Sequence, residues 1–475
     1  MHKINRYIYI FIITCITVTT SCKKSYFDLS ENPNLVKNPS LQSLLTTVTS
    51  KTGIDNYTVG STTSTYVQYT ANPSASAASD TYQVIDLTGT WDALYLAMAD
   101  INDLKKLAVA QSSSEYIGVA DVLYSYHLSL VADLWGDAPY TEAFNPPTIL
   151  TPKYDSQQDL YKASVTLMDE AITQLAKTDA TVKLLASNDL IHGGDRTKWL
   201  KTAYALKARL LNKVSKTTTY NQAAVLAALG SSYTSNADDA GMASFALRNN
   251  WASVAVSNAS LTLGGWLSEQ FIDQLNGVTY GIFDPRIRKI TDPTVTGTFI
   301  GTTNGAGNRP PGNNTVKDEN YISVSSPWTS NTAPILIVTY AELKFIEAEA
   351  AFRSNDRNRA YAAYIAGITA NMDKLQVPAG AERTAYLSSP IVAVGAANLT
   401  LALIFKEKYV ATYLNPEAWN DVRRNDYQYK DFTLPVNAVL TSFIRRIEYP
   451  VGERSKNGIN VPAVKPQTER LWWDM

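Results

Sequence analysis

The chain has 475 residues, which is enough for one large domain or for about two to three ordinary ones. Its 42 Lys and Arg balance 43 Asp and Glu, so the charge indicates neither a nucleic-acid partner nor an acidic solvating tail. The two cysteines are Cys15 and Cys22, so no disulfide can form downstream of residue 22 and packing must supply the stability.

The first 22 residues have the pattern of an export signal. Lys3 and Arg6 precede an apolar run over residues 8–18, and small polar residues lead to Cys22. The run is too short to span a bilayer as a helix, so residues 1–21 are predicted to be a cleaved signal peptide. A cysteine at this place is similar to a bacterial lipoprotein processing site, which predicts lipidation of Cys22. An ordinary secreted protein with an incidental cysteine and an uncut signal anchor are the alternatives.

Residues 22–40 carry two Asn-Pro turn signals and are predicted to be a lipidated tether. Residues 41–58 are predicted to form a first helix, and residues 59–83, rich in Ser, Thr and Ala, a loop. Apolar residues then recur at helical spacing and predict four helical units. These units are 88–110 with 115–135, 154–178 with 196–216, 335–353 with 357–375, and a shorter one at 397–425. Pairs of about 35 to 45 residues are typical of degenerate tetratricopeptide-like repeats, with an irregular helical bundle as the alternative.

The predicted fold class is mostly α, with four tetratricopeptide-like helix pairs forming a cradle and an irregular loop-rich region carrying short β pieces. Residues 41–475 are predicted to be a single domain. Its helical repeats are expected at 88–230 and 334–425, and its irregular, ligand-binding region at 231–333, where Gly, Pro, Asn, Ser and Thr are frequent. Short strands are expected near residues 242–257 and 320–325.

No arrangement of residues in the sequence indicates catalysis, a metal or a cofactor. His127 and His192 are the two histidines downstream of the signal, and neither belongs to a recognisable nucleophile arrangement. The sequence contains no HExxH motif, zinc-binding cysteine pair or Gly-rich phosphate loop. Glu342 and Glu349 share one face of a predicted helix, as a glycosidase pair could, but a polar helix face explains them better. The protein is therefore predicted not to be an enzyme.

Aromatic residues in loop-like segments are the candidate ligand-binding residues. Flat rings stack on the apolar faces of sugars while polar side chains bind the hydroxyls, so this inventory is typical of a capture site. The alternative is that each ring packs its loop onto the helical scaffold. The seven candidates are Tyr66, Tyr69, Tyr82, Trp251, Trp266, Tyr280 and Trp328.

Five segments in order resemble the SusD/RagB superfamily of outer-membrane nutrient-binding lipoproteins, in particular SusD-like subgroup 2. They are 133–144 (DLWGDAPYTEAF) with 152–155, 194–199 (GDRTKW) with 205–210, 284–286 (DPR), 339–350 (TYAELKFIEAEA), and 417–424 (EAWNDVRR) with 445–450. The resemblance runs from Cys22 to the C-terminus. We interpret the motifs as scaffold, with Asp195 as a helix cap and Glu417, Trp419, Arg423 and Arg424 as an ion-pair cluster around an indole.

The resemblance implies non-catalytic capture of a nutrient, a glycan or oligosaccharide, and its delivery to a SusC-like TonB-dependent transporter. The protein would be lipid-anchored in the outer membrane, facing the cell surface, and would act as a hinged lid over the transporter. Ligand residues of this family lie in variable loops, so no residue role carries over from it. Capture of a peptide or other nutrient is the alternative within the same class. A secreted glycoside hydrolase and a purely structural lipoprotein are the alternatives from other classes.

Overall fold

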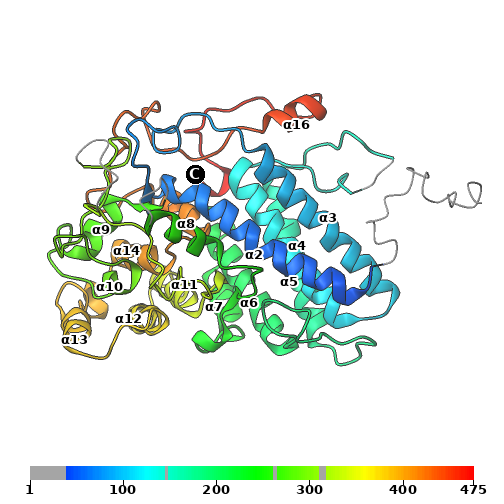
Figure 1. Ribbon diagram of the computed structural model, residues 1–475. Coiled ribbons are helices and arrows are strands. Elements are labelled where there is room, and N and C mark those ends of the chain that lie inside the picture. The colour runs from blue at the N-terminus through cyan, green and yellow to red at the C-terminus, as the bar shows by residue number, and fades with distance from the viewer. Residues whose placement is uncertain (1–38, 145–147, 260–264, 310–316) are drawn as a thin grey trace, which may run out of the picture. The chain divides into compact units, whose positions relative to one another are not determined.

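The computed structural model describes residues 39–144, 148–259, 265–309 and 317–475 (Figure 1). Cys22 and the predicted signal peptide lie outside these residues. The chain divides into two units, Met1–Ser40 and Leu41–Met475, and every helix and strand described belongs to the second. Among the described residues, no helix combines the length and the apolar character needed to cross a membrane.

Helices packed side by side in chain order make up most of this unit. α2 (Leu41–Tyr66) packs against α3 (Thr88–Ala110), which packs against α4 (Ser114–Trp135). The series continues through α5 (Gln157–Ala176), α6 (Arg196–Lys213), α7 (Gln222–Gly230), α11 (Tyr340–Arg353), α12 (Arg357–Lys374) and α14 (Leu401–Ala411). Figure 1 shows this succession from the blue α2 through cyan and green to the yellow α12. The mostly α fold class and the predicted helix pairs are confirmed.

Polar residues begin several of these helices. Ser156, Asp195 and Thr339 precede α5, α6 and α11, and each side chain accepts a hydrogen bond from a backbone N–H of the first turn. α4 is buried on nearly all faces and ends at Gly136, whose φ is 90°. The predicted cap at Asp195 and the helix end at residues 135–136 are confirmed.

The region between α7 and α11 contains short elements. They are β2 (Ala240–Met242), α8 (Asn250–Ala259), β3 (Trp266–Leu267), α9 (Glu269–Asn276), α10 (Ile287–Ile290) and β4 (Ile335–Val338). β1 (Thr70–Ala71) pairs antiparallel with β3, and β2 pairs antiparallel with β4. Three further helices follow α12, namely α13 (Ala381–Ser388), α15 (Glu417–Arg424) and α16 (Val451–Lys456).

Three local predictions are wrong. α2 continues to Tyr66 through the start of the predicted loop, because Val59, Thr63 and Tyr66 face the core and their burial outweighs the loop-like composition. The strand predicted near residues 242–257 is present only at its start, as β2, because residues 250–259 form α8, and near residues 320–325 only Tyr321 makes an isolated bridge. The helix predicted from residue 335 begins at Tyr340, because residues 335–338, three of which are β-branched, form β4 instead.

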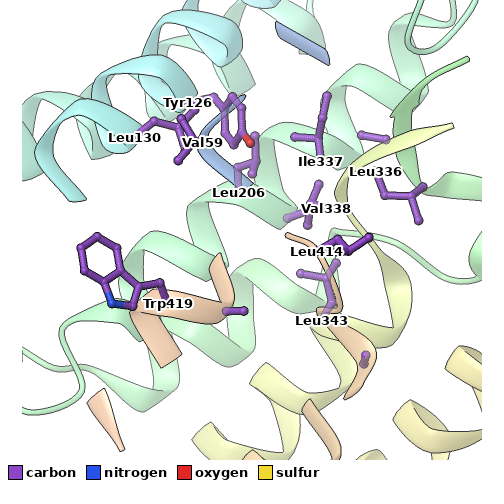
Figure 2. Close-up of a cluster of buried hydrophobic side chains, with 14 of the residues drawn as sticks. Val59, Tyr126, Leu130, Leu206, Leu336, Ile337, Val338, Leu343, Leu414 and Trp419 are labelled. Atoms are coloured by element: carbon purple, nitrogen blue, oxygen red, sulfur yellow. The ribbon is translucent and has the colours of Figure 1, made fainter. Parts of the chain in front are cut away.

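An apolar core lies where α2, α4, α6, β4 and α11 meet (Figure 2). Its labelled side chains are Val59, Tyr126, Leu130, Leu206, Leu336, Ile337, Val338, Leu343, Leu414 and Trp419. Each exposes 8% of its surface or less. Burying one such side chain contributes roughly 1.5–3 kcal/mol, so this cluster fixes α2 and β4 against the helical series.

Buried ion pairs join the same helices. Arg209 of α6 donates two hydrogen bonds to Glu342 of α11, at 2.7 and 2.6 Å. Arg424 of α15 donates to both oxygens of Glu349, at 2.8 and 3.0 Å. The prediction of a polar helix face for these glutamates is wrong: each is 1% exposed, and a buried carboxylate needs a charged partner.

The ion-pair cluster predicted around the Trp419 indole is confirmed only for the contact of Arg423 with the ring, since no ion pair of Arg423 or Glu417 is found among the described residues. Arg424 pairs with Glu349 and Asp421 and lies over the Phe405 ring instead. The Arg423 guanidinium lies 3.7 Å from the Trp419 ring centroid and donates to the carbonyl of Asp133 at 2.9 Å. Arg286, in the third motif, donates to Asp284 and to Glu407 of α14. The motif residues therefore hold the scaffold together.

Candidate functional site

A cavity of about 340 Å³ lies between α2, β1 and α8, and we call it the α2–α8 groove. Its volume falls within the range of small-molecule sites. None of the residues that line it is charged. They are Ser61, Thr62, Thr65, Tyr66, Thr70, Ala71, Asn72, Ser79, Ile85, Leu87, Trp251, Val254 and Gly265.

α2 supplies hydroxyl groups to one wall of the groove. Ser61, Thr62 and Thr65 lie at helical spacing, are half-buried, and donate to carbonyls of their own helix at 2.9, 3.1 and 3.3 Å. A hydroxyl that donates in this way keeps its oxygen lone pairs for a ligand. This wall therefore presents hydrogen-bond acceptors.

Asn72, which directly follows β1, supplies a donor. Its Oδ1 accepts a hydrogen bond from the N–H of Ser74 at 2.9 Å, while no described residue bonds its Nδ2. The aliphatic residues Ile85, Leu87 and Val254 lie between these polar groups. The groove thus combines hydroxyls, one amide and apolar patches, which suits an uncharged polar ligand.

Asp80 braces the loop that forms the rim. It is fully buried and accepts hydrogen bonds from the N–H of Asn72 at 2.8 Å and from that of Gly305 at 3.2 Å. Burial raises the pKa of Asp80 to about 6, although these hydrogen bonds oppose the rise. Gly305 has a φ of 81°, and a Cβ there would lie 1.9 Å from the Val436 carbonyl oxygen, so the contact requires glycine.

Two of the seven predicted aromatic residues line the groove. Tyr66 and Trp251 are 3% and 5% exposed, so each presents only a small part of its surface to the cavity. Behind the wall, Tyr66 packs on Trp419 with ring centroids 5.3 Å apart, and Trp251 packs edge-on against Tyr57 at 4.8 Å. These contacts fix the two rings.

Four other candidates lie in the core. Tyr69 donates its hydroxyl to the Tyr409 carbonyl, and Trp328 donates its Nε1–H to the Tyr413 carbonyl at 3.1 Å. Tyr82 and Trp266 are also buried, and neither lines the groove. Here these rings pack loop segments onto the scaffold.

Tyr280, the seventh candidate, is half-buried and outside the groove, with the Lys406 ammonium 4.8 Å from its ring centroid. Of the seven, only Tyr66 and Trp251 line the groove, although Tyr82 packs edge-on against Tyr66 with ring centroids 6.1 Å apart. Contact with a ligand stays a prediction for all seven residues.

The histidines lie apart from the groove. His192 is buried and hydrogen-bonds the Thr202 hydroxyl at 2.6 Å, and burial lowers the pKa of His192 to about 4. His127 lies between the Leu123 carbonyl and the Asp55 carboxylate. Within the described ranges, no three His, Cys, Asp or Glu side chains are placed to hold a metal ion.

A second cavity, of about 250 Å³, lies at the opposite end of the β1–β3 pair, and we call it the acidic cavity. Gln68 and Ser268 line it, together with the carboxylates of Glu269, Asp273 and Asp431. Burial raises the pKa of Asp273, and repulsion by the two other carboxylates adds to the rise. This cavity therefore differs from the groove in charge.

A family model described as "Starch-binding associating with outer membrane" matches residues 33–450. The chain belongs to this SusD-like family. A search of curated proteins finds no significant relative of this SusD-like chain.

Solved structures show that its fold is shared. A SusD/RagB family protein from Bacteroides thetaiotaomicron is 22% identical, with 92% of this chain and 99% of that one covered and a TM-score of 0.73. A chitin-binding SusD homologue from Flavobacterium johnsoniae is 19% identical, with 91% and 98% covered and a TM-score of 0.75. A SusD homologue from Bacteroides fragilis is 20% identical, with 92% and 99% covered and a TM-score of 0.73.

Proposed function

We propose that this SusD-like protein captures a glycan in the α2–α8 groove and delivers it to a SusC-like TonB-dependent transporter. The observation that carries the proposal is the uncharged lining of the groove, with hydroxyls from α2, the free amide group of Asn72 and small parts of the Tyr66 and Trp251 surfaces. A neutral sugar offers hydroxyls for the polar groups and C–H faces for the apolar ones. The family description as starch-binding and the chitin-binding relative support this ligand class.

The site is suited to capture without hydrolysis. Glycoside hydrolysis commonly uses two carboxyl groups flanking the bond that is cleaved, and no carboxylate lines the groove. Glu342 and Glu349, which share one helix face as a glycosidase pair could, form ion pairs with Arg209 and Arg424 in the core. Incubation of the protein with a neutral oligosaccharide should therefore release no shorter product.

Anchoring and delivery complete the proposal. Lipid on Cys22 would hold the protein at the outer membrane, where the family is described to associate, and the tether would keep the groove near its transporter at high effective concentration. Cys22→Ser should shift the protein from the membrane fraction to the soluble one. Extraction in mild detergent without any co-purifying barrel would contradict the transporter partner.

Peptide capture is the second candidate, and the acidic cavity favours it. Asp273 and Asp431 there suit a ligand that carries an ammonium or guanidinium group, whereas Glu269 already pairs with Arg309 at 2.6 Å. The groove and the acidic cavity thus point to different ligands, and one screen separates them.

The screen measures binding of the intact protein to neutral oligosaccharides, including malto- and chito-oligosaccharides, and to peptides with and without Lys or Arg. Binding of a neutral oligosaccharide is the expected result. Binding of basic peptides alone would replace glycan capture by the second candidate.

A further inference from the structure

A third cavity, of about 340 Å³, lies in the helical series, and we call it the aromatic pocket. α3, α4, α5 and the segment 140–144 form its walls. The lining residues are Asn102, Lys105, Lys106, Tyr124, Tyr140, Thr141, Ala143, Phe144 and Leu167. None of them lines the α2–α8 groove, so this pocket is a separate site.

Three rings form one side of the pocket. Tyr124 packs edge-on against Tyr140, with ring centroids 5.8 Å apart, and edge-on against Phe144, at 6.2 Å. Phe144 has a φ of 61°, an uncommon conformation for a non-glycine residue, and its ring also contacts Tyr95 at 6.1 Å. The rings are therefore fixed before any ligand arrives, which lowers the entropic cost of binding.

Polar groups without protein partners converge on the same space. Tyr124 is only 7% exposed, yet no described residue bonds its hydroxyl. The Tyr140 hydroxyl and the Asn102 side chain also have no hydrogen-bond partner among the described residues. The Tyr124 side chain is buried, but its hydroxyl oxygen is open to the pocket, where water or a ligand can bond it.

The two lysines of the pocket differ in whether a carboxylate pairs with them. Lys105 lies 2.6 Å from the buried Asp121 carboxylate and 3.2 Å from that of Glu170. Lys106, at the next position of α3, is exposed and forms no ion pair with a described carboxylate. The two lysines and the two carboxylates that contact Lys105 sum to zero charge, so Lys106 is notable only as the lysine of the lining that no described carboxylate holds. It lies beside three rings and three polar groups that no described residue bonds.

We propose that the aromatic pocket binds an anionic sugar, with its carboxylate, sulfate or phosphate on Lys106. The ring faces and edges would contact the C–H groups of the sugar, and Tyr124, Tyr140 and Asn102 would bind its hydroxyls. This site would operate beside the neutral-glycan groove and does not rest on the function proposed for it.

The test is calorimetric titration with galacturonate, glucuronate, N-acetylneuraminate and glucose 6-phosphate, each compared with galactose or glucose. At least one acid should bind, and about tenfold tighter than the neutral sugars, because a charge-assisted hydrogen bond adds affinity. Lys106→Met should abolish this preference. Lys162→Met, which removes an exposed lysine of α5, is the matched control and should preserve it.

A second variant distinguishes loss of binding from loss of folding. Tyr124→Phe removes a hydroxyl that no described residue bonds, so thermal unfolding should stay unchanged while the affinity for the acid falls roughly three- to tenfold. Thr65→Arg in the groove should leave binding of the acid intact. The proposal is overturned if none of the four acids binds, if Lys106→Met keeps the preference, or if Tyr124→Phe binds as tightly as the unaltered protein.

Discussion

The helical series and the loop-rich region between α7 and α11 differ in how their stabilising interactions are placed. In the helical series, buried charges pair across helices, as Arg209 with Glu342 and Arg424 with Glu349. In the loop-rich region, Arg286 pairs with its near neighbour Asp284, and Phe271 packs its ring on Tyr413, which follows α14, with centroids 4.9 Å apart. The charged pairs are directional and recur in the motifs that resemble the family, whereas ring packing tolerates many sequences. This difference explains why motifs identify the scaffold but do not identify the ligand site.

One of the largest expected effects comes from removing a buried charge in the helical series. Arg424→Met removes the cation that bridges Glu349 and Asp421, which keep as cations only Arg353 at 3.0 Å and Lys408 at 2.8 Å, and should lower the free energy of unfolding by about 3 kcal/mol. Arg288→Met is the control, because Arg288 and Glu382 form a pair that is about half exposed, and its loss should cost at most about 1 kcal/mol. Urea unfolding measures both; equal losses would show that burial does not set the strength of these pairs.

Phe271→Ala tests how much ring packing stabilises the loop-rich region. Phe271 is fully buried and contacts Tyr69, Tyr409 and Tyr413, so the cavity left behind should cost roughly 3–4 kcal/mol. Urea unfolding at low and high salt measures the loss, which should not depend on salt because no charge is removed. A loss below about 1 kcal/mol would mean that the rings are not what stabilises this region.

The contact between the two regions should respond to pH. Burial alone would raise the pKa of Glu407, but Lys406 and Arg286 outweigh it and lower the pKa to about 2. The unfolded chain protonates this carboxyl near its ordinary value of 4.5, so its stabilisation is complete above pH 4.5 and is lost as the pH falls to 2.

The loss from this group should be about 3 kcal/mol, read from urea unfolding between pH 5 and pH 2. Glu407→Gln should be less stable at pH 5 and should vary less with pH over this range. The same pH dependence in the variant and the unaltered protein would assign acid unfolding to other carboxylates.

The smallest expected effect concerns one hydrogen bond in the groove. Asn72→Ala removes an Nδ2 donor that no described residue uses, so the affinity for a neutral oligosaccharide should fall roughly three- to tenfold. Titration calorimetry measures the change. An unchanged affinity would place the sugar elsewhere along the groove.

Much of the scaffold could be predicted from the sequence. Apolar periodicity located the helices of the series, and Asp195 was identified as a cap because its side chain fits that position. The sequence pattern does not predict that Glu342 and Glu349 are buried, because a buried helix face that contains paired charges has the composition of an exposed polar face. Their arginine partners lie more than 70 positions away in the sequence.

The groove was harder to predict. Its hydroxyls, Ser61, Thr62 and Thr65, lie in a segment whose composition indicates a loop, and α2 continues through this segment because its other face is buried against the core. The signal that could have shown this is the helical spacing from Val59 to Tyr66, both of which face the core. The aromatic candidates are predicted from ring chemistry. Most of them are buried in the core, and only Tyr66 and Trp251 line the cavity.

Capture of a neutral glycan by the α2–α8 groove is tested most directly by two substitutions on one helix. Thr65→Arg places a long charged side chain in the groove, whereas Thr47→Arg places the same side chain on an exposed position of α2 outside it. Calorimetric titration with the neutral oligosaccharide that binds best should show loss of at least about tenfold in affinity for Thr65→Arg and none for Thr47→Arg. Equal affinity in both variants would contradict glycan capture by this groove.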